Sequence, residues 1–120
     1  MNYSLIIPIY NEGHTLQLLL NKLDKLNNNN NIEIIIIDDG SNDDTKEILN
    51  KNDLFIILNN KINSGKGASI KKGIKSANNQ NIILIDGDLE IDIDQIPRLI
   101  KKYEKSDKDV LTGIRWNKNS

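Results

Sequence analysis

Short apolar runs alternate along this chain with segments whose apolar residues recur every three or four positions. The short runs are rich in Ile and predict strands, whereas the periodic segments predict amphipathic helices. Because the two kinds alternate, the sequence predicts an α/β fold with a mostly parallel central sheet and helices on both faces. The predicted strands cover residues 3–9, 32–37, 54–58, 82–85 and 110–112, and the predicted helices cover residues 16–26, 45–50, 65–77 and 95–105.

Polar turns follow three of the predicted strands. Residues 10–12 follow the first strand, residues 38–41 the second and residues 86–90 the fourth. In an open α/β sheet, ligands bind outside the carboxyl ends of the strands, where the strand order reverses. We therefore expect the three turns to converge on one ligand site.

The composition is that of one domain with balanced charge. The 120 residues carry 16 Lys and Arg against 17 Asp and Glu, so the formal net charge of −1 offers no field that would attract nucleic acid. No cysteine is present, which excludes disulfides, thiolate metal sites and a Cys nucleophile. Any metal would therefore be bound through oxygen atoms or through His14, the single histidine of the chain.

Lysines and asparagines gather in several short segments. The lysines within residues 66–75 and 101–105 have the spacing of solvated helix faces. The asparagines at 27–31, 59–60 and 78–79 fall between periodic segments, and we interpret them as polar loop filler. Neither group indicates a function.

Two features of the sequence bear on membrane insertion and export. No apolar stretch approaches the roughly 20 residues that span a bilayer. Residues 1–4 lack the basic start of a signal peptide. We therefore expect a cytoplasmic chain, for which peripheral contact with the cytoplasmic membrane face or with a partner subunit stays open.

The most informative turn is Asp86-Gly87-Asp88, directly after a predicted buried strand. Mg²⁺ and Mn²⁺ prefer oxygen ligands and are often held by one or two carboxylates together with substrate phosphates. Asp86 and Asp88 are therefore candidate metal ligands, and Glu90 can join them directly or through water. The alternative is a turn in which two aspartates merely end a strand.

The same acidic segment lacks the pattern of a calcium loop of the EF-hand type. A loop that starts at Asp86 would need Gly at its sixth position and Glu at its twelfth, where this chain has Ile91 and Pro97. The EF-hand interpretation is therefore rejected. Asp92 and Asp94 are interpreted as solvated, with Asp94 able to cap the following helix.

A second acidic turn, at Asp38-Asp39-Gly40-Ser41, offers acceptors for the N–H groups of a base or the hydroxyls of a ribose. The alternative is an Asx turn ahead of a helix, for which Asp43 is a plausible cap. Tyr10 can border a nucleobase beside Pro8, although both residue types also serve core or turn packing.

Gly65-Lys66-Gly67 opens a predicted helix, and the free amides of a helix start can bind an anion. The segment lacks the Walker pattern, and as a dinucleotide fingerprint it has Ile70 where the third glycine belongs. Lys66 is thus a minor candidate for a phosphate contact. His14 is expected to be exposed, and Arg115 is a candidate for neutralising a phosphate.

Taken together, these residues resemble the amino-terminal part of a family 2 glycosyltransferase of the GT-A fold, in the group of polyprenyl-phosphate (dolichyl-phosphate) mannose or glucose synthases. Each motif alone is weak, but five of them stand in the family's order and at its approximate spacings. They are residues 4–12, 38–45, 63–68, 86–90 and 112–115.

The resemblance implies a Rossmann-like GT-A sandwich that moves a sugar, with inversion, from a GDP- or UDP-sugar to a lipid-phosphate or glycan acceptor. It implies that Asp86, Gly87 and Asp88 contact the sugar nucleotide, that Asp86, Asp88 and Glu90 hold Mg²⁺ or Mn²⁺, and that Asp88 and Arg115 act in catalysis. It also implies that five residues line the nucleoside pocket: Pro8, Tyr10, Glu12, Ile37 and Asp39.

The chain departs from that group at two positions and in length. Gly87 stands where the group often has Ala, and Glu90 stands where it often has Gln. Residues 1–120 correspond to the nucleotide-sugar-binding part, without the region that supplies the acceptor site. The alternatives are therefore a non-catalytic nucleotide-sugar-binding module or a half-enzyme that needs a partner, and a dinucleotide-dependent oxidoreductase is a weaker third.

Overall fold

Strands and helices alternate in the predicted order. A computed structural model describes residues 2–29, 32–85, 93–104 and 115–117. In chain order the elements are β1 (Tyr3–Ile9), α1 (Gly13–Asn29), β2 (Ile32–Asp38), α2 (Thr45–Asn50), β3 (Ile56–Asn59), α3 (Lys66–Ser76), β4 (Asn81–Leu84), a 3-10 turn η1 (Ile93–Gln95), α4 (Ile96–Glu104) and β5 (Arg115–Asn117).

The sheet has the strand order β3-β2-β1-β4-β5, in which the first four strands are parallel. The last strand, β5, pairs with β4 in the antiparallel sense, with Arg115 opposite Ile83. The predicted α/β fold with a mostly parallel sheet is thereby confirmed. The strand predicted at residues 110–112 lies outside the described residues.

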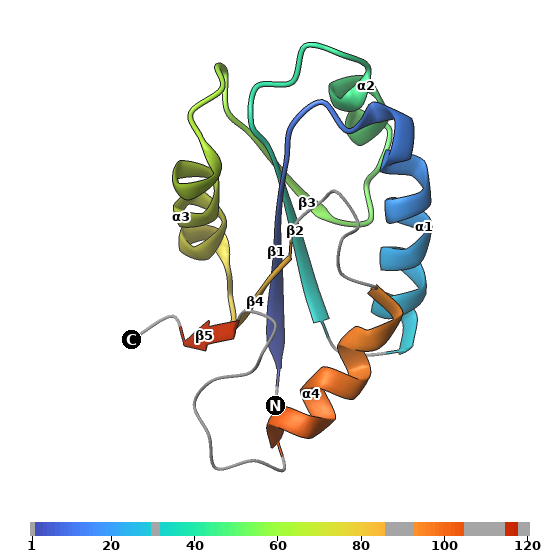
Figure 1. Ribbon diagram of the computed structural model, residues 1–120, viewed down its shortest axis with the longest axis vertical. Helices are drawn as coiled ribbons and strands as arrows, with labels where there is room; N and C mark the ends of the chain where they lie inside the picture. Colours follow the sequence, from blue (N-terminus) through green and yellow to red (C-terminus); the bar gives the residue numbers. More distant parts are fainter. Residues whose placement is uncertain (1, 30–31, 86–92, 105–114, 118–120) are drawn as a thin grey trace.

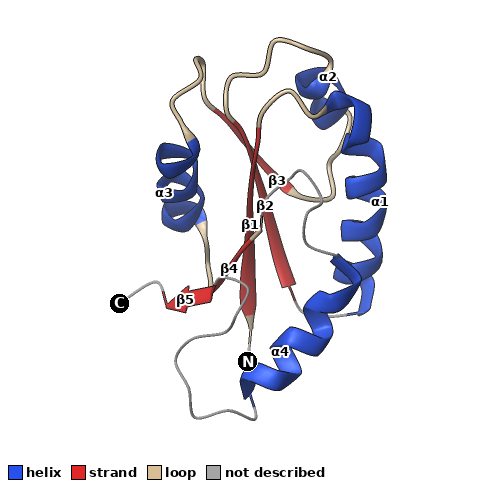
Figure 2. Ribbon diagram, in the orientation of Figure 1, coloured by secondary structure: helices blue, strands red, loops and turns tan. Residues whose placement is uncertain are grey.

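Helices cover both faces of the sheet, as predicted (Figure 1). Helices α1, α2 and α4 lie on one face and α3 lies on the other, which Figure 2 shows as two blue layers around the red strands. Side chains on alternate positions of β2 fill the two cores, because successive residues of a strand point to opposite faces. Ile34 and Ile36 join the core under α1, and Ile35 and Ile37 join the core under α3.

Helix α3 lies very close to the sheet at Gly73. A Cβ atom there would be 2.6 Å from Cγ2 of Ile6 and 2.8 Å from Cδ1 of Ile37. The absence of a side chain at Gly73 is therefore what allows α3 to rest on β1 and β2. Ile37, a predicted pocket residue, has no exposed surface at all in this packing.

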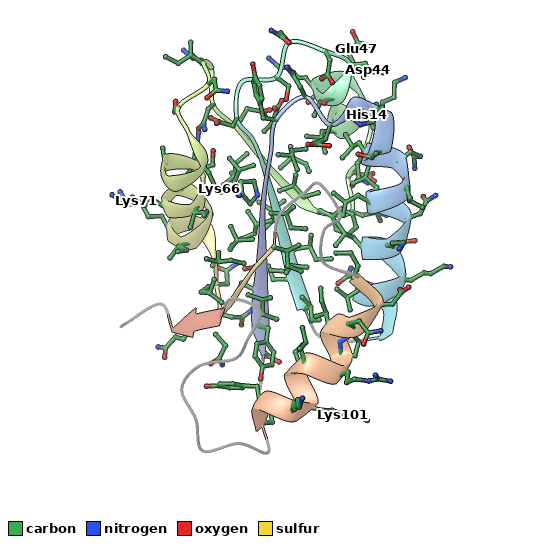
Figure 3. The ribbon with its side chains drawn as sticks, viewed as in Figure 1. His14, Asp44, Glu47, Lys66, Lys71 and Lys101 are labelled. Carbon is green, nitrogen blue, oxygen red and sulfur yellow. The ribbon has the colours of Figure 1, made fainter. Side chains whose placement is uncertain are left out.

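Charged side chains lie on the outer faces of the helices. Figure 3 shows Lys71 on α3 pointing away from the sheet, and Lys101 lies on the exposed side of α4. Both agree with the predicted solvated faces. In the part of the chain that the structure describes, none of the helices combines the length and apolar character needed to cross a bilayer.

At the amino-terminal edge of the sheet, Asn78 and Asn79, which were predicted to be loop filler, make hydrogen bonds to β1 and β2. Glu33 of β2 accepts hydrogen bonds from the Ser4 hydroxyl (2.8 Å), the Asn78 amide (2.9 Å) and the Asn78 side chain (2.5 Å). The Asn79 side chain donates to the Tyr3 carbonyl (3.1 Å). The filler interpretation is therefore wrong for these two residues, which tie the end of α3 to β1 and β2.

We expect Asn78→Ala to lower the free energy of unfolding by about 0.5–1.5 kcal/mol, the usual contribution of one hydrogen bond, because it removes the side-chain bond to Glu33. Urea denaturation of the two proteins measures the difference. Gln80→Ala, a change at an exposed neighbour, is the matched control and is expected to stay within about 0.5 kcal/mol of the unmodified chain. Equal losses in the two variants would contradict the assignment.

Candidate nucleotide site at the carboxyl edge of the sheet

The carboxyl ends of the parallel strands β1, β2 and β3 meet at one edge, at the upper end of Figure 1. The loops after these strands are residues 10–12, 39–44 and 60–65. The strand order reverses between β1 and β4, because β2 and β3 lie on one side of β1 and β4 lies on the other. This edge is therefore the place where an open α/β sheet binds its ligand.

Pro8 marks the point where β1 and β4 separate. Leu84, the last residue of β4, pairs with Ile6, and the Ile85 amide donates to the Ile6 carbonyl at 3.1 Å. Backbone groups alternate along a strand, so the nitrogen of Pro8 faces the same side two residues further on. Pro8 has no N–H to donate there, and β4 has already ended, so the ladder loses nothing.

Reciprocal hydrogen bonds join the loop after β1 to the loop after β2. The Asn11 amide donates to the Ser41 hydroxyl, and the Asn42 amide donates to the Asn11 side chain, both at 2.9 Å. Asn11 has a φ of 52°, a left-handed conformation that Asn tolerates better than most residues. The two turns that the sequence predicted to converge thus lie side by side.

Asp43 connects the starts of α1 and α2. Its carboxylate accepts hydrogen bonds from the Gly13 amide (3.2 Å) and the Thr45 amide (2.9 Å). Burial raises the pKa of Asp43, but the hydrogen bonds from Thr45 and Gly13 outweigh it, so the pKa lies below its ordinary value of 3.8. The predicted capping role of Asp43 is confirmed, because Asp43 accepts from the first helical amide, that of Thr45. Asp44 occupies the N-cap position itself and makes no side-chain cap bond.

His14 is exposed at the start of α1, as predicted. Figure 3 shows it near Asp44 and Glu47, where the starts of α1 and α2 meet. Among the described residues, no group of three or more His, Asp or Glu side chains is placed to hold a metal ion.

Asp39 is the most constrained carboxylate of the edge. It is only 5% exposed, and its Oδ1 accepts from the Ser64 amide (2.7 Å) and the Asn60 side chain (2.9 Å). Its Oδ2 accepts from the Gly65 amide at 2.9 Å. Burial raises the pKa of Asp39, but these hydrogen bonds and one from Ser69 lower it by more, so Asp39 stays ionised well below neutral pH.

The hydrogen bonds of Asp39 use backbone amides at the start of α3. The sequence predicted free amides there that could bind a phosphate, yet the amides of Ser64 and Gly65 already bind the Asp39 carboxylate. The protein's own anion thus occupies part of the predicted anion site. Lys66, the first residue of α3, is exposed.

Gly40 allows the loop after β3 to lie directly on the loop after β2. It has a φ of 73°, and a Cβ atom there would be 2.5 Å from both the Asn63 nitrogen and the Ile62 carbonyl carbon. The backbone of residues 62 and 63 therefore crosses Gly40 at van der Waals distance.

The predicted pocket residues occupy three kinds of position. Tyr10 is 41% exposed at the end of β1, and Asp39 lies beside it, because the Asp39 amide donates to the Ile9 carbonyl at 2.9 Å. Glu12 is half-buried, and its carboxylate accepts from the Thr15 hydroxyl at 3.2 Å. Pro8 and Ile37 are paired across β1 and β2 and are buried, so a ligand could meet Ile37 only through its backbone.

The acidic motif follows β4 in the sequence. Asp86, Gly87, Asp88 and Glu90 lie outside the described residues, so their roles stay predictions. The strand that leads into them is fixed beside β1 through Ile85 and Ile6. Arg115 begins β5, which pairs with β4.

Sequence comparison places the chain among known proteins. Residues 4–120 match the family described as Glycosyl transferase family 2. The chain is 37% identical over 125 residues to an undecaprenyl-phosphate 4-deoxy-4-formamido-L-arabinose transferase of Photorhabdus laumondii, covering 96% of this chain and 37% of that protein. It is 32% identical over 122 residues to a dolichol-phosphate mannosyltransferase of Pyrococcus furiosus, covering 98% of this chain and 34% of that protein. The chain spans about half or less of the length of the curated relatives that it matches.

Solved structures have the same fold. S. aureus TarS, residues 1–349, in complex with UDP-GlcNAc superposes with a TM-score of 0.73 at 24% identity, over 91% of this chain and 33% of that chain. The mannosyltransferase PcManGT of Pyrobaculum calidifontis, in complex with GDP-Man and Mn²⁺, superposes with a TM-score of 0.59 at 22% identity, over 72% of this chain and 27% of that chain. These likenesses confirm the predicted GT-A arrangement. Together with the match over residues 4–120, the sheet and its carboxyl edge identify this chain as a member of glycosyl transferase family 2.

Proposed function

We propose that the chain provides the nucleotide-sugar site of an inverting, metal-dependent glycosyltransferase whose acceptor is a polyprenyl phosphate. The observation that carries the proposal is that hydrogen bonds join the loops after β1 and β2. These loops lie beside the end of β4, where the strand order reverses, in a chain that belongs to this family. Two relatives named as transferases to undecaprenyl phosphate and dolichol phosphate support the choice of acceptor.

The metal would be Mg²⁺ or Mn²⁺, held by Asp86 and Asp88 with help from Glu90. Carboxylate oxygens suit these hard cations, which are usually held by one or two carboxylates together with phosphate oxygens of the substrate. PcManGT, a protein of the same fold, was solved with GDP-Man and Mn²⁺. A cation bound there would offset the negative charge that develops on the departing diphosphate.

The described residues would hold the nucleoside. Tyr10 presents an exposed ring at the end of β1, and Pro8 fixes the direction of the chain beneath it. Glu12 brings negative charge to the same place, where N–H or hydroxyl groups of the ligand are suitable donors. Asp39, whose carboxylate is bound by the amides of Ser64 and Gly65, holds the adjoining loop. Arg115, at the start of β5, would neutralise a phosphate of the donor or of the acceptor.

A lipid-phosphate acceptor suits this set of residues. A phosphate oxygen is already a competent nucleophile, so transfer to it needs no protein base. A single displacement at the anomeric carbon would release the nucleoside diphosphate and invert the configuration. A polyprenyl phosphate lies in a membrane, so the reaction would take place at a membrane surface, and we propose the cytoplasmic face.

A second candidate is binding of the nucleotide sugar without transfer by residues 1–120 alone. It is favoured by one observation, that the matched region is about half or less of each relative's length. An assay of sugar transfer to a short-chain polyprenyl phosphate, with hydrolysis of the donor measured alongside, separates the two candidates.

Calorimetric titration with UDP, GDP and NAD, each with and without Mn²⁺, tests the proposed function. We expect UDP or GDP to bind with Mn²⁺, and NAD not to bind. We further expect Asp88→Ala to weaken the Mn²⁺-dependent binding at least tenfold, because one of the proposed carboxylate ligands is lost.

Asp92→Ala is the matched control, since it removes a carboxylate from the same segment at a position predicted to be solvated. Its affinity is expected to equal that of the unmodified chain. Retention of full metal-dependent affinity by the Asp88 variant would show that this carboxylate is not a ligand, and tight binding of NAD would favour the oxidoreductase alternative instead.

A further inference from the structure

Asn60, the residue after β3, joins three elements through its own hydrogen bonds. Its backbone amide donates to the Asp38 carbonyl at 2.8 Å. Its side-chain nitrogen donates to Asp39 Oδ1 (2.9 Å) and to the Ser69 hydroxyl (3.0 Å), and its side-chain oxygen accepts from Lys72 Nζ (3.2 Å). Both donor hydrogens of the amide are thereby used, so a role of Asn60 must act through these partners.

The partner that matters for ligand binding is Asp39. Its carboxylate accepts from the Asn60 side chain and from two successive amides at the start of α3, those of Ser64 and Gly65. These three donors fill three of the roughly four acceptor positions of a carboxylate. The protein itself therefore satisfies Asp39 and holds it in one orientation.

Lys72 fastens the same loop from the helix side. Its Nζ donates to the Asn59 carbonyl at 2.6 Å as well as to the Asn60 side chain. Asn59 is the last residue of β3, the edge strand of the sheet. The loop of residues 60–65 is thus anchored to β2 through Asp39, to α3 through Ser69 and Lys72, and to the backbone of Gly40 by contact.

We propose that Asn60 is a positioning residue for nucleotide binding, which fixes the Asp39 carboxylate on the amides of Ser64 and Gly65 and makes the loop of residues 60–65 a rigid wall of the site. The nucleotide part rests on the proposed function, whereas the anchoring of the loop does not. Asp39 then contributes to affinity mainly by holding this wall. Sequence reasoning missed Asn60 because it lies in an asparagine pair that was interpreted as filler.

The test uses the 120-residue chain with Asn60→Ala and Asn60→Leu. The Leu variant has nearly the same shape as Asn and carries no charge, but it loses the donor to Asp39 and Ser69, so it serves if the Ala variant does not fold. Asn52→Ala is the matched control, because Asn52 is also a loop asparagine. In the described part of the chain, its side chain accepts a local hydrogen bond from the Leu54 amide (2.9 Å).

Three quantities are measured by NMR and calorimetry. Without nucleotide, amide exchange at Ser64 and Gly65 is expected to accelerate about tenfold in the Asn60 variants, while the amides of Ile35 and Ile36 in β2 are unchanged. The titration midpoint of the Asp39 carboxyl is expected to rise. The affinity for UDP or GDP with Mn²⁺ is expected to fall at least fivefold, and the control keeps all three values, a pattern that general destabilisation would not give.

The anchoring is overturned if Ser64 and Gly65 exchange at the unmodified rate in both variants, or if the β2 amides accelerate equally. The positioning role requires that the unmodified chain binds nucleotide. It is overturned if the loop loosens in the Asn60 variants while their affinity for nucleotide equals that of the unmodified chain. If the unmodified chain binds neither UDP nor GDP, the proposed function and the nucleotide role fail together, and the exchange rates still decide the anchoring.

Discussion

Replacement of Asp39 by alanine is expected to destabilise the fold by about 3–5 kcal/mol. The change leaves the amides of Ser64 and Gly65 and the side chain of Asn60 without their acceptor at a place where Asp39 is only 5% exposed. Each donor left unpaired in a buried position costs about 1–3 kcal/mol, and part of that cost is recovered as the loop relaxes toward water. Urea denaturation measures the free energy of unfolding.

The pH dependence of this loss identifies its source. Hydrogen bonds hold the folded pKa of Asp39 below its ordinary value of 3.8 despite the opposing effect of burial. A lowered folded pKa means that the stabilisation is fully present above pH 3.8 and is lost as the pH falls through the folded pKa. The difference in the free energy of unfolding between the unmodified chain and Asp39→Ala is therefore expected to be constant near neutral pH. It is expected to become smaller below pH 3.8.

Asp53→Ala supplies the control, since Asp53 is an exposed aspartate before β3 and its loss is expected to cost within about 0.5 kcal/mol at every pH. If the difference in the free energy of unfolding between the unmodified chain and Asp39→Ala stayed constant or grew at acidic pH, the stabilisation could not be assigned to an ionised carboxylate.

The role of Asp39 also explains how a flat sheet edge acquires a rigid rim. A helix start carries partial positive charge and unpaired amides, which ordinarily bind water or a ligand anion. Here a carboxylate from the end of β2 takes that place at α3, and Asp43 does the same between α1 and α2. Two carboxylates of the protein itself, those of Asp39 and Asp43, therefore hold the loops of the edge. A ligand then meets a surface that is already ordered.

The pattern of apolar residues predicted the elements well where they are bounded by polar residues on both sides. The strand at Tyr3–Ile9 and the helix at Thr45–Asn50 have the predicted bounds. The strand predicted at residues 54–58 is instead Ile56–Asn59, because pairing begins where Ile56 meets Ile35 of β2. Leu54 is 60% exposed despite its apolar character, and nothing local marks that difference.

The site was predictable at the level of loops but not of atoms. Topology alone places the turns after β1 and β2 at one edge, and the motifs point to Tyr10, Glu12 and Asp39. The hydrogen bonds of Asn60 and the approach of residues 62–63 to Gly40 join segments about twenty residues apart, and only the packed fold brings them together. Ile37 illustrates the converse, since its place in the motif implied a pocket but its side chain lies in the core.

The second large effect is expected at Gly40, where Gly40→Ala should lower the free energy of unfolding by about 2–4 kcal/mol. A φ of 73° is unfavourable for Ala by about 1–2 kcal/mol, and the new Cβ would lie 2.5 Å from backbone atoms of Ile62 and Asn63. Backbone atoms cannot turn aside as a side chain can, so the loop must move, and its bonds to Asp39 weaken with it. Thermal or urea denaturation measures the loss.

Gly67 provides a matched control of opposite sign. It lies in the first turn of α3, a Cβ there would meet nothing within 4 Å, and its φ is not positive. Gly67→Ala is therefore expected to raise stability by about 0.4–1 kcal/mol, because alanine has less conformational freedom to lose in the unfolded chain. If both alanine variants moved stability in the same direction, the loss at Gly40 could not be assigned to its backbone conformation and to the loop that crosses it. Opposite signs would show that the loop of residues 60–65 depends on the missing side chain at Gly40.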